Sequence, residues 1–129
     1  MKILIVDDDP ATLLVASMAL QYAGGYEVLL ANSGKDAIEC ARENRPDAIL
    51  MDIVMRDLDG LSVLNMLRNA VETGSIPIIF HTARNNPNEI NNLLSSGAQG
   101  VIRKPTDPLE LGNEIRRILA RGKDFPPNN

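Results

Sequence analysis

The residues with the clearest chemical potential are aspartates that follow short apolar segments. Asp7, Asp8 and Asp9 come directly after the run ILIV, and Asp52 comes directly after the run AILM. Carboxylates that lie close together repel one another unless a positive charge lies among them. A hard divalent cation such as Mg²⁺ supplies that charge, and it prefers a few carboxylates together with water and phosphate oxygens. The aspartates therefore predict a site for Mg²⁺, with Mn²⁺ as a possible substitute.

Two further side chains fit the chemistry of phosphoryl transfer. With Mg²⁺ held by two of the aspartates, the third can act as a nucleophile toward phosphorus. Thr82 follows a fourth apolar segment and Lys104 a fifth, directly before Pro105. Their hydroxyl and ammonium groups can bind the other phosphoryl oxygens, because this chemistry needs positioning and compensating charge more than covalent work by the protein.

Short apolar segments alternate with segments of helical spacing along the chain. The expected strands are Ile3–Val6, Glu27–Leu30, Ala48–Met51, Ile76–Phe80 and Gly100–Ile102. Helix start signals lie between them, because a capping residue precedes a proline or a capping partner stands three positions later. These signals are Asp9-Pro10, Ser33 with Asp36, Asn86-Pro87 and Asp107-Pro108. In the last helix, Leu111, Ile115, Ile118 and Leu119 form one apolar stripe.

The strand segments are apolar without alternation, which is typical of parallel strands covered on both faces by helices. Five strand–helix repeats with right-handed crossovers predict one doubly wound α/β domain. Ligands of such sheets bind beyond the carboxyl ends of the strands. The aspartates, Thr82 and Lys104 are therefore expected to converge on one edge.

Composition excludes several classes of protein. The chain has 129 residues, a net charge of −4, two tyrosines and two phenylalanines, so it lacks the basic stripe and aromatic platform expected of a nucleic-acid-binding domain. Its lone Cys40 and lone His81 make neither an internal disulfide nor a His/Cys zinc site. Neither a membrane span nor a signal peptide is recognisable, so we expect a cytoplasmic protein that does not insert into membranes.

Taken in order, the motifs resemble the receiver domain of the two-component response regulator family. The matching segments are ILIVDDDP, ILMDIVM followed by DLDG, PIIFHTA and IRKP. The resemblance covers residues 2–121, and residues 122–129 are expected to form a C-terminal tail or the start of a linker. It implies a flavodoxin-like sheet of five parallel strands in the order 2-1-3-4-5, with helices on both faces.

The resemblance also assigns roles at the carboxylate cluster. Asp52 resembles the aspartate that accepts the phosphoryl group. Asp8 resembles the direct Mg²⁺ ligand, Asp7 resembles the ligand that acts largely through water, and the backbone carbonyl of Val54 is implied as a further ligand.

Two more roles, and the partners, follow from the same resemblance. Thr82 resembles the switch hydroxyl and Lys104 the lysine that pairs with the phosphoryl group, with a cis peptide bond before Pro105. The donor is expected to be a sensor histidine kinase or a phosphotransfer protein. The surface of the fourth helix, fifth strand and fifth helix is expected to control an output protein or a downstream effector domain, and offers a possible homodimer contact.

Some positions depart from the family pattern. Arg56 stands where a proline commonly follows the methionine of the third-strand loop, and Val101 replaces the usual switch aromatic. Valine has no ring to swing inward, so output is expected to rely on Thr82 and on the loop and helix after it. Val54 and Arg84 occupy positions that flank the attacking water in this family, and a valine there predicts slow dephosphorylation because it cannot orient water.

Two alternatives remain open from the sequence. A receiver-like docking module that ignores phosphate is favoured by Val101 and Arg56. The other alternative is a haloacid-dehalogenase-like phosphatase. That family has one aspartate after its first strand and a second aspartate two residues later, as Asp7 and Asp9 are placed here. Ala11, however, stands where that family has Thr or Val.

Overall fold

The computed structural model describes residues 1–124, in which five strands alternate with helices. The strands are β1 (Lys2–Val6), β2 (Glu27–Ala31), β3 (Ala48–Met51), β4 (Ile78–Thr82) and β5 (Gly100–Arg103). The helical segments are α1 (Pro10–Met18), the π-helical turn η1 (Ala19–Ala23), α2 (Gly34–Asn44), α3 (Gly60–Arg68), α4 (Pro87–Ser95) and α5 (Pro108–Asp124).

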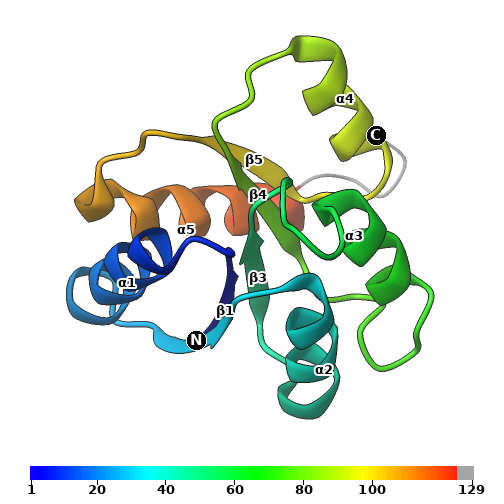
Figure 1. Cartoon of the computed structure of the whole chain (residues 1–129). Coiled ribbons are helices and arrows are strands. Elements are labelled where there is room, and N and C mark those ends of the chain that lie inside the picture. The colour runs from blue at the N-terminus through cyan, green and yellow to red at the C-terminus, as the bar shows by residue number, and fades with distance from the viewer. Residues whose placement is uncertain (125–129) are drawn as a thin grey trace.

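All five strands are parallel, and their order across the sheet is β2-β1-β3-β4-β5. Helices cover both faces, with α1 and α5 on one side and α2 and α3 on the other (Figure 1). The predicted fold class and strand order are confirmed. Strand order reverses between β1 and β3, which are neighbours in space, and the carboxyl ends of these two strands carry the aspartates.

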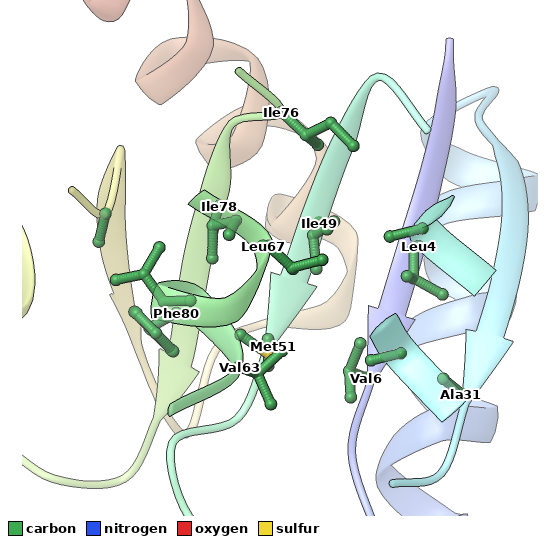
Figure 2. Close-up of a cluster of buried hydrophobic side chains, with 14 of the residues drawn as sticks. Leu4, Val6, Ala31, Ile49, Met51, Val63, Leu67, Ile76, Ile78 and Phe80 are labelled. Atoms are coloured by element: carbon green, nitrogen blue, oxygen red, sulfur yellow. The ribbon is translucent and has the colours of Figure 1, made fainter. Parts of the chain in front are cut away.

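The sheet separates two apolar layers. Side chains of alternate strand positions, such as Leu4, Ile49 and Phe80, pack against α2, α3 and α4 on one face, as Figure 2 shows for part of this cluster. The intervening positions pack against α1 and α5 on the other face. Because both faces of the central strands are buried, their sequences are apolar throughout rather than alternating.

The predicted helix starts are confirmed by their hydrogen bonds. The side chains of Asp9, Ser33 and Asn86 each accept a main-chain N–H from the first turn of the following helix. Asp59 does the same for α3, where its Oδ1 atom accepts from the N–H of Ser62 at 2.8 Å. These caps satisfy donors that have no partner within the helix.

β1, β2 and β5 are each one residue longer than predicted, and two boundaries differ by more than one residue. β4 runs from Ile78 to Thr82 instead of from residue 76 to 80, because Pro77 lacks an N–H and the N–H of Ile76 is used in a turn with Thr73. Consequently Thr82 ends the strand rather than following it. At the other end α5 continues to Asp124, so residues 122–124 of the expected tail are helical, and residues 125–129 lie outside the described residues.

The apolar stripe predicted for the last helix is confirmed. Leu111, Ile115 and Ile118 are buried against the sheet, and Leu119 is partly buried beside them. Within residues 1–124, no helix combines the length and the apolar character needed to cross a membrane.

Candidate functional site

Three of the predicted site residues meet at the carboxyl edge of the sheet. Asp7 follows β1, Asp52 follows β3 and Lys104 follows β5. The Nζ atom of Lys104 donates to Oδ2 of Asp7 at 2.8 Å and to Oδ2 of Asp52 at 3.4 Å. One ammonium group therefore links two carboxylates from strands that are far apart in the sequence.

These charges lie in a partly desolvated site. The side chain of Asp7 is only 4% exposed, whereas those of Asp52 and Lys104 are 17% and 22% exposed. Burial raises the pKa of Asp52, Lys104 opposes that rise and Asp7 adds to it. Burial lowers the pKa of Lys104, but the hydrogen bond to Asp7 and the charge of Asp52 raise it above its usual value overall. The lysine is therefore charged and fixed between its partners.

Asp8 lies at the same edge but has a different partner. Its Oδ2 atom accepts the main-chain N–H of Arg56 at 3.0 Å and lies 3.6 Å from Nε of the same arginine. Its side chain is 23% exposed, and that of Arg56 is 86% exposed. The β3–α3 loop thus holds the Asp8 carboxylate through a residue whose identity departs from the family pattern.

The donor set at this edge suits a hard divalent cation. The carboxylates of Asp7, Asp8 and Asp52, together with the main chain around Val54, offer the oxygen ligands that Mg²⁺ prefers. In this structure, however, no three acidic, histidine or cysteine side chains among residues 1–124 lie close enough together to bind a metal ion without rearrangement. Asp8 is turned to Arg56 and the other two carboxylates share Lys104. The chemistry of the donor set fits the ion, and in this structure each of the three carboxylates is paired with a cationic side chain of the protein.

Thr82 is buried at the end of β4, next to β5 in the sheet. Its hydroxyl oxygen accepts the main-chain N–H of Arg84 at 3.1 Å. The Arg84 side chain in turn donates to Glu89 in the first turn of α4 at 2.9 Å. The hydroxyl is therefore connected through one residue to the start of α4.

Val54 lies on the loop that follows the candidate phosphorylation site. Its N–H points to Oδ1 of Asp52 at 3.4 Å, and its side chain is half exposed. The structure thus places the main chain of Val54 beside Asp52, and the valine side chain offers no polar atom at that position.

His81 is a buried polar residue that the chemistry above does not use. It lines a cavity of about 460 Å³ between α1 and α5, and its buried Nε2 atom has no hydrogen-bond partner in the described part of the chain. Burial and the nearby charge of Lys104 lower the pKa of His81 to about 4. A neutral, packed histidine agrees with the structural role predicted for it.

Two site contacts were not foreseen from the sequence. The contact of Arg56 with Asp8 joins residues that are 48 positions apart, and only the missing proline at position 56 hinted at a difference there. Asp57 accepts the N–H groups of Gly34 and Lys35 at 2.9 and 3.0 Å, so it caps α2 from the loop after β3. The peptide bond between Lys104 and Pro105 is cis, as the resemblance implied.

The fold and the edge site together define a receiver-type α/β domain. The family model for the response regulator receiver domain matches residues 3–116. This chain belongs to that family.

Individual relatives agree with this assignment. The chain is 40% identical to the response regulator MprA of Mycobacterium leprae over 123 residues. This matched segment covers 95% of this chain and 53% of MprA. It is 35% identical to Protein PilH of Pseudomonas aeruginosa, over 92% of this chain and 98% of that one. It therefore spans about half the length of MprA and nearly all of PilH.

Solved structures show the same fold. The chemotaxis response regulator CheY4 of Vibrio cholerae superposes with a TM-score of 0.84 at 31% identity, over 91% of this chain and 97% of that one. A putative response regulator from Chloroflexus aurantiacus superposes with a TM-score of 0.84 at 33% identity, over 93% of this chain and 98% of that one. Family membership leaves no support for the phosphatase alternative.

Proposed function

We propose that this chain is the phosphorylation-controlled switch of a two-component system, with Asp52 as the phosphoryl acceptor. The observation that carries the proposal is the Lys104 ammonium group fixed between Asp7 and Asp52 at the edge where β1, β3 and β5 end. A carboxylate that is held beside a fixed cation, near the buried hydroxyl of Thr82, suits the transfer of an anionic group.

The reaction moves a phosphoryl group from a donor histidine to Asp52. The bond from phosphorus to the imidazole nitrogen breaks, a bond from phosphorus to a carboxylate oxygen forms, and the nitrogen keeps the electron pair. Lys104 and Thr82 bind the phosphoryl oxygens while the attacking carboxylate oxygen of Asp52 gives up its negative charge to the new bond with phosphorus. Mg²⁺ or Mn²⁺, held by Asp7, Asp8, Asp52 and the carbonyl of Val54, supplies further positive charge when bound.

The partners follow from this chemistry. A sensor histidine kinase or a phosphotransfer protein supplies the phosphoryl group, in the cytoplasm. The movement of Thr82 toward that group biases an existing equilibrium of the surface formed by α4, β5 and α5, and this surface binds an output protein, a downstream effector domain or a second copy of the chain.

The experiment compares the parent with Asp52→Asn, using beryllofluoride with Mg²⁺ as a stable mimic of the aspartyl phosphate. Asp36→Asn is the matched control, because Asp36 is an exposed carboxylate in α2. When Mg²⁺ and beryllofluoride are added, the backbone amide NMR signals of residues 52, 82 and 104 are expected to shift in the parent and in the control. The same signals are expected not to shift in Asp52→Asn.

The spread of the shifts distinguishes the possible outputs. Shifts that reach α4 and α5 support the switch, although position 101 is a valine. Shifts confined to the edge site mean that a partner must recognise that site directly. An absence of beryllofluoride binding in the parent would instead favour the docking module that ignores phosphate.

A further inference from the structure

Arg56 holds the one site carboxylate that Lys104 does not. Its main-chain N–H donates to Oδ2 of Asp8 at 3.0 Å, and its guanidinium Nε lies 3.6 Å from the same oxygen. Lys104 serves Asp7 and Asp52. Every carboxylate of the edge site therefore has a cationic partner supplied by the protein itself.

We propose that Arg56 competes with the divalent cation for Asp8 and so sets the metal affinity of the site. This inference rests on the proposed function only in taking Asp8 as a metal ligand. Arg56 neutralises part of the negative charge of Asp8, and it occupies lone pairs of the Oδ2 atom. A divalent cation that binds either oxygen of this carboxylate is attracted by the same charge, so metal binding and the Arg56 contacts weaken each other.

The two contacts of Arg56 contribute in different ways. The guanidinium is 86% exposed, so its ion pair with Asp8 is a weak, salt-screened competitor. The main-chain N–H makes a shorter, charge-assisted hydrogen bond that alanine would retain. Proline removes both contacts, because it has neither a guanidinium nor an N–H.

The contacts also join metal binding to the β3–α3 loop. Arg56 lies between Val54, whose N–H points at Asp52, and Asp57, whose carboxylate caps α2. Weaker contacts between Arg56 and Asp8 loosen one of the anchors of this loop. Amides at the amino-terminal end of α2 are therefore expected to respond to the metal in the parent.

The test is a Mg²⁺ titration of the unphosphorylated protein, followed through backbone amide NMR shifts at low ionic strength. Arg56→Ala is expected to bind Mg²⁺ roughly two- to fivefold more tightly than the parent. Arg56→Pro is expected to bind more tightly still. Arg42→Ala, which removes the same charge from an exposed position of α2, is the matched control and is expected to leave the affinity unchanged.

The outcomes separate this proposal from the proposed function. The gain in Arg56→Ala should shrink as salt is added, because the lost ion pair is exposed. Equal Mg²⁺ affinities in the parent, Arg56→Ala and Arg56→Pro, with beryllofluoride still binding at Asp52, would overturn the role of Arg56 alone. A parent and variants that bind neither Mg²⁺ nor beryllofluoride would overturn both proposals.

Discussion

At the scale of single residues, the site balances negative charge against positive charge within the protein. Asp7 is nearly fully buried and is held by Lys104 at 2.8 Å, whereas the more exposed Asp8 is held by Arg56. Such pairing matters because an unpaired charge in a partly dry site is costly. Two residues around this cluster give predictions, one about the proposed phosphoryl group and one about the response of the fold to pH.

Val54 gives the first prediction at this scale. Val54→Asn is expected to lose the phosphoryl group from Asp52 about tenfold faster than the parent, because an amide beside the site can orient the attacking water. The decay of phosphorylated protein, followed by intact mass, measures this rate. The matched control is Val71→Asn, because Val71 is 98% exposed in the turn after α3. Equal decay in Val54→Asn and the parent would contradict the role of position 54.

His81 gives a prediction about pH. Its pKa is lowered from 6.5 to about 4 in the folded protein, so the unfolded chain binds a proton that the folded chain does not between these values. The neutral ring therefore makes its full contribution to the free energy of unfolding above pH 6.5, and this contribution is lost as the pH falls toward 4. The loss corresponds to about 3 kcal/mol at about 1.4 kcal/mol per pH unit.

Urea denaturation of the parent and of His81→Leu across this pH range is the measurement. The variant is expected to lose less stability than the parent as the medium is acidified, since it has no ring to protonate. Parallel curves for the two proteins would show that His81 does not titrate in this window.

At the scale of elements, the site depends on how closely α3 approaches the end of β3. Gly60 is the first residue of α3, and its N–H donates to the carbonyl of Ile53 at 2.6 Å. A Cβ atom at position 60 would lie 2.6 Å from a ring carbon of Phe80 and 2.8 Å from the main-chain oxygen of Asp52. The helix can lie against the start of the β3–α3 loop because this position has no side chain.

Gly60→Ala is therefore expected to destabilise the fold by about 2 kcal/mol through overpacking. Gly112→Ala is the contrasting substitution, because a Cβ there has no neighbour closer than 3.4 Å and alanine favours the interior of α5. Its expected effect is neutral to stabilising, by up to about 1 kcal/mol. The midpoints of urea denaturation of the two variants test both expectations. Similar midpoints would show that α3 can move away from β3 and Phe80 to make room for the added methyl group.

At the scale of the whole molecule, the edge site joins segments from both ends of the chain. Lys104 contacts Asp7, which lies 97 positions earlier, and Asp52, which lies 52 positions earlier. The ion pairs therefore exist only when β1, β3 and β5 are all in register. The site is consequently complete only in the folded domain.

Lys104→Gln is expected to destabilise the whole domain by about 3 kcal/mol at neutral pH, because Asp7 and Asp52 then lie together without their cation. Adding Asp7→Asn to that variant should recover part of the loss by removing one of the two charges. Lys35→Gln, at an exposed position of α2, serves as the control. Urea unfolding at neutral pH measures all four proteins, and a Lys104→Gln variant as stable as the control would refute the coupling.

The sequence by itself determined the α/β class, the approximate strands, the helix caps and the family, because these depend on local spacing and on residue types at strand ends. It also identified Asp7, Asp52, Thr82 and Lys104 as residues of one edge. Only the tertiary structure decided that Lys104 serves two carboxylates while Arg56 holds the third, and that Asp57 caps α2. These contacts depend on strand register and on the path of the β3–α3 loop, and such long-range geometry leaves no periodic signal in the chain.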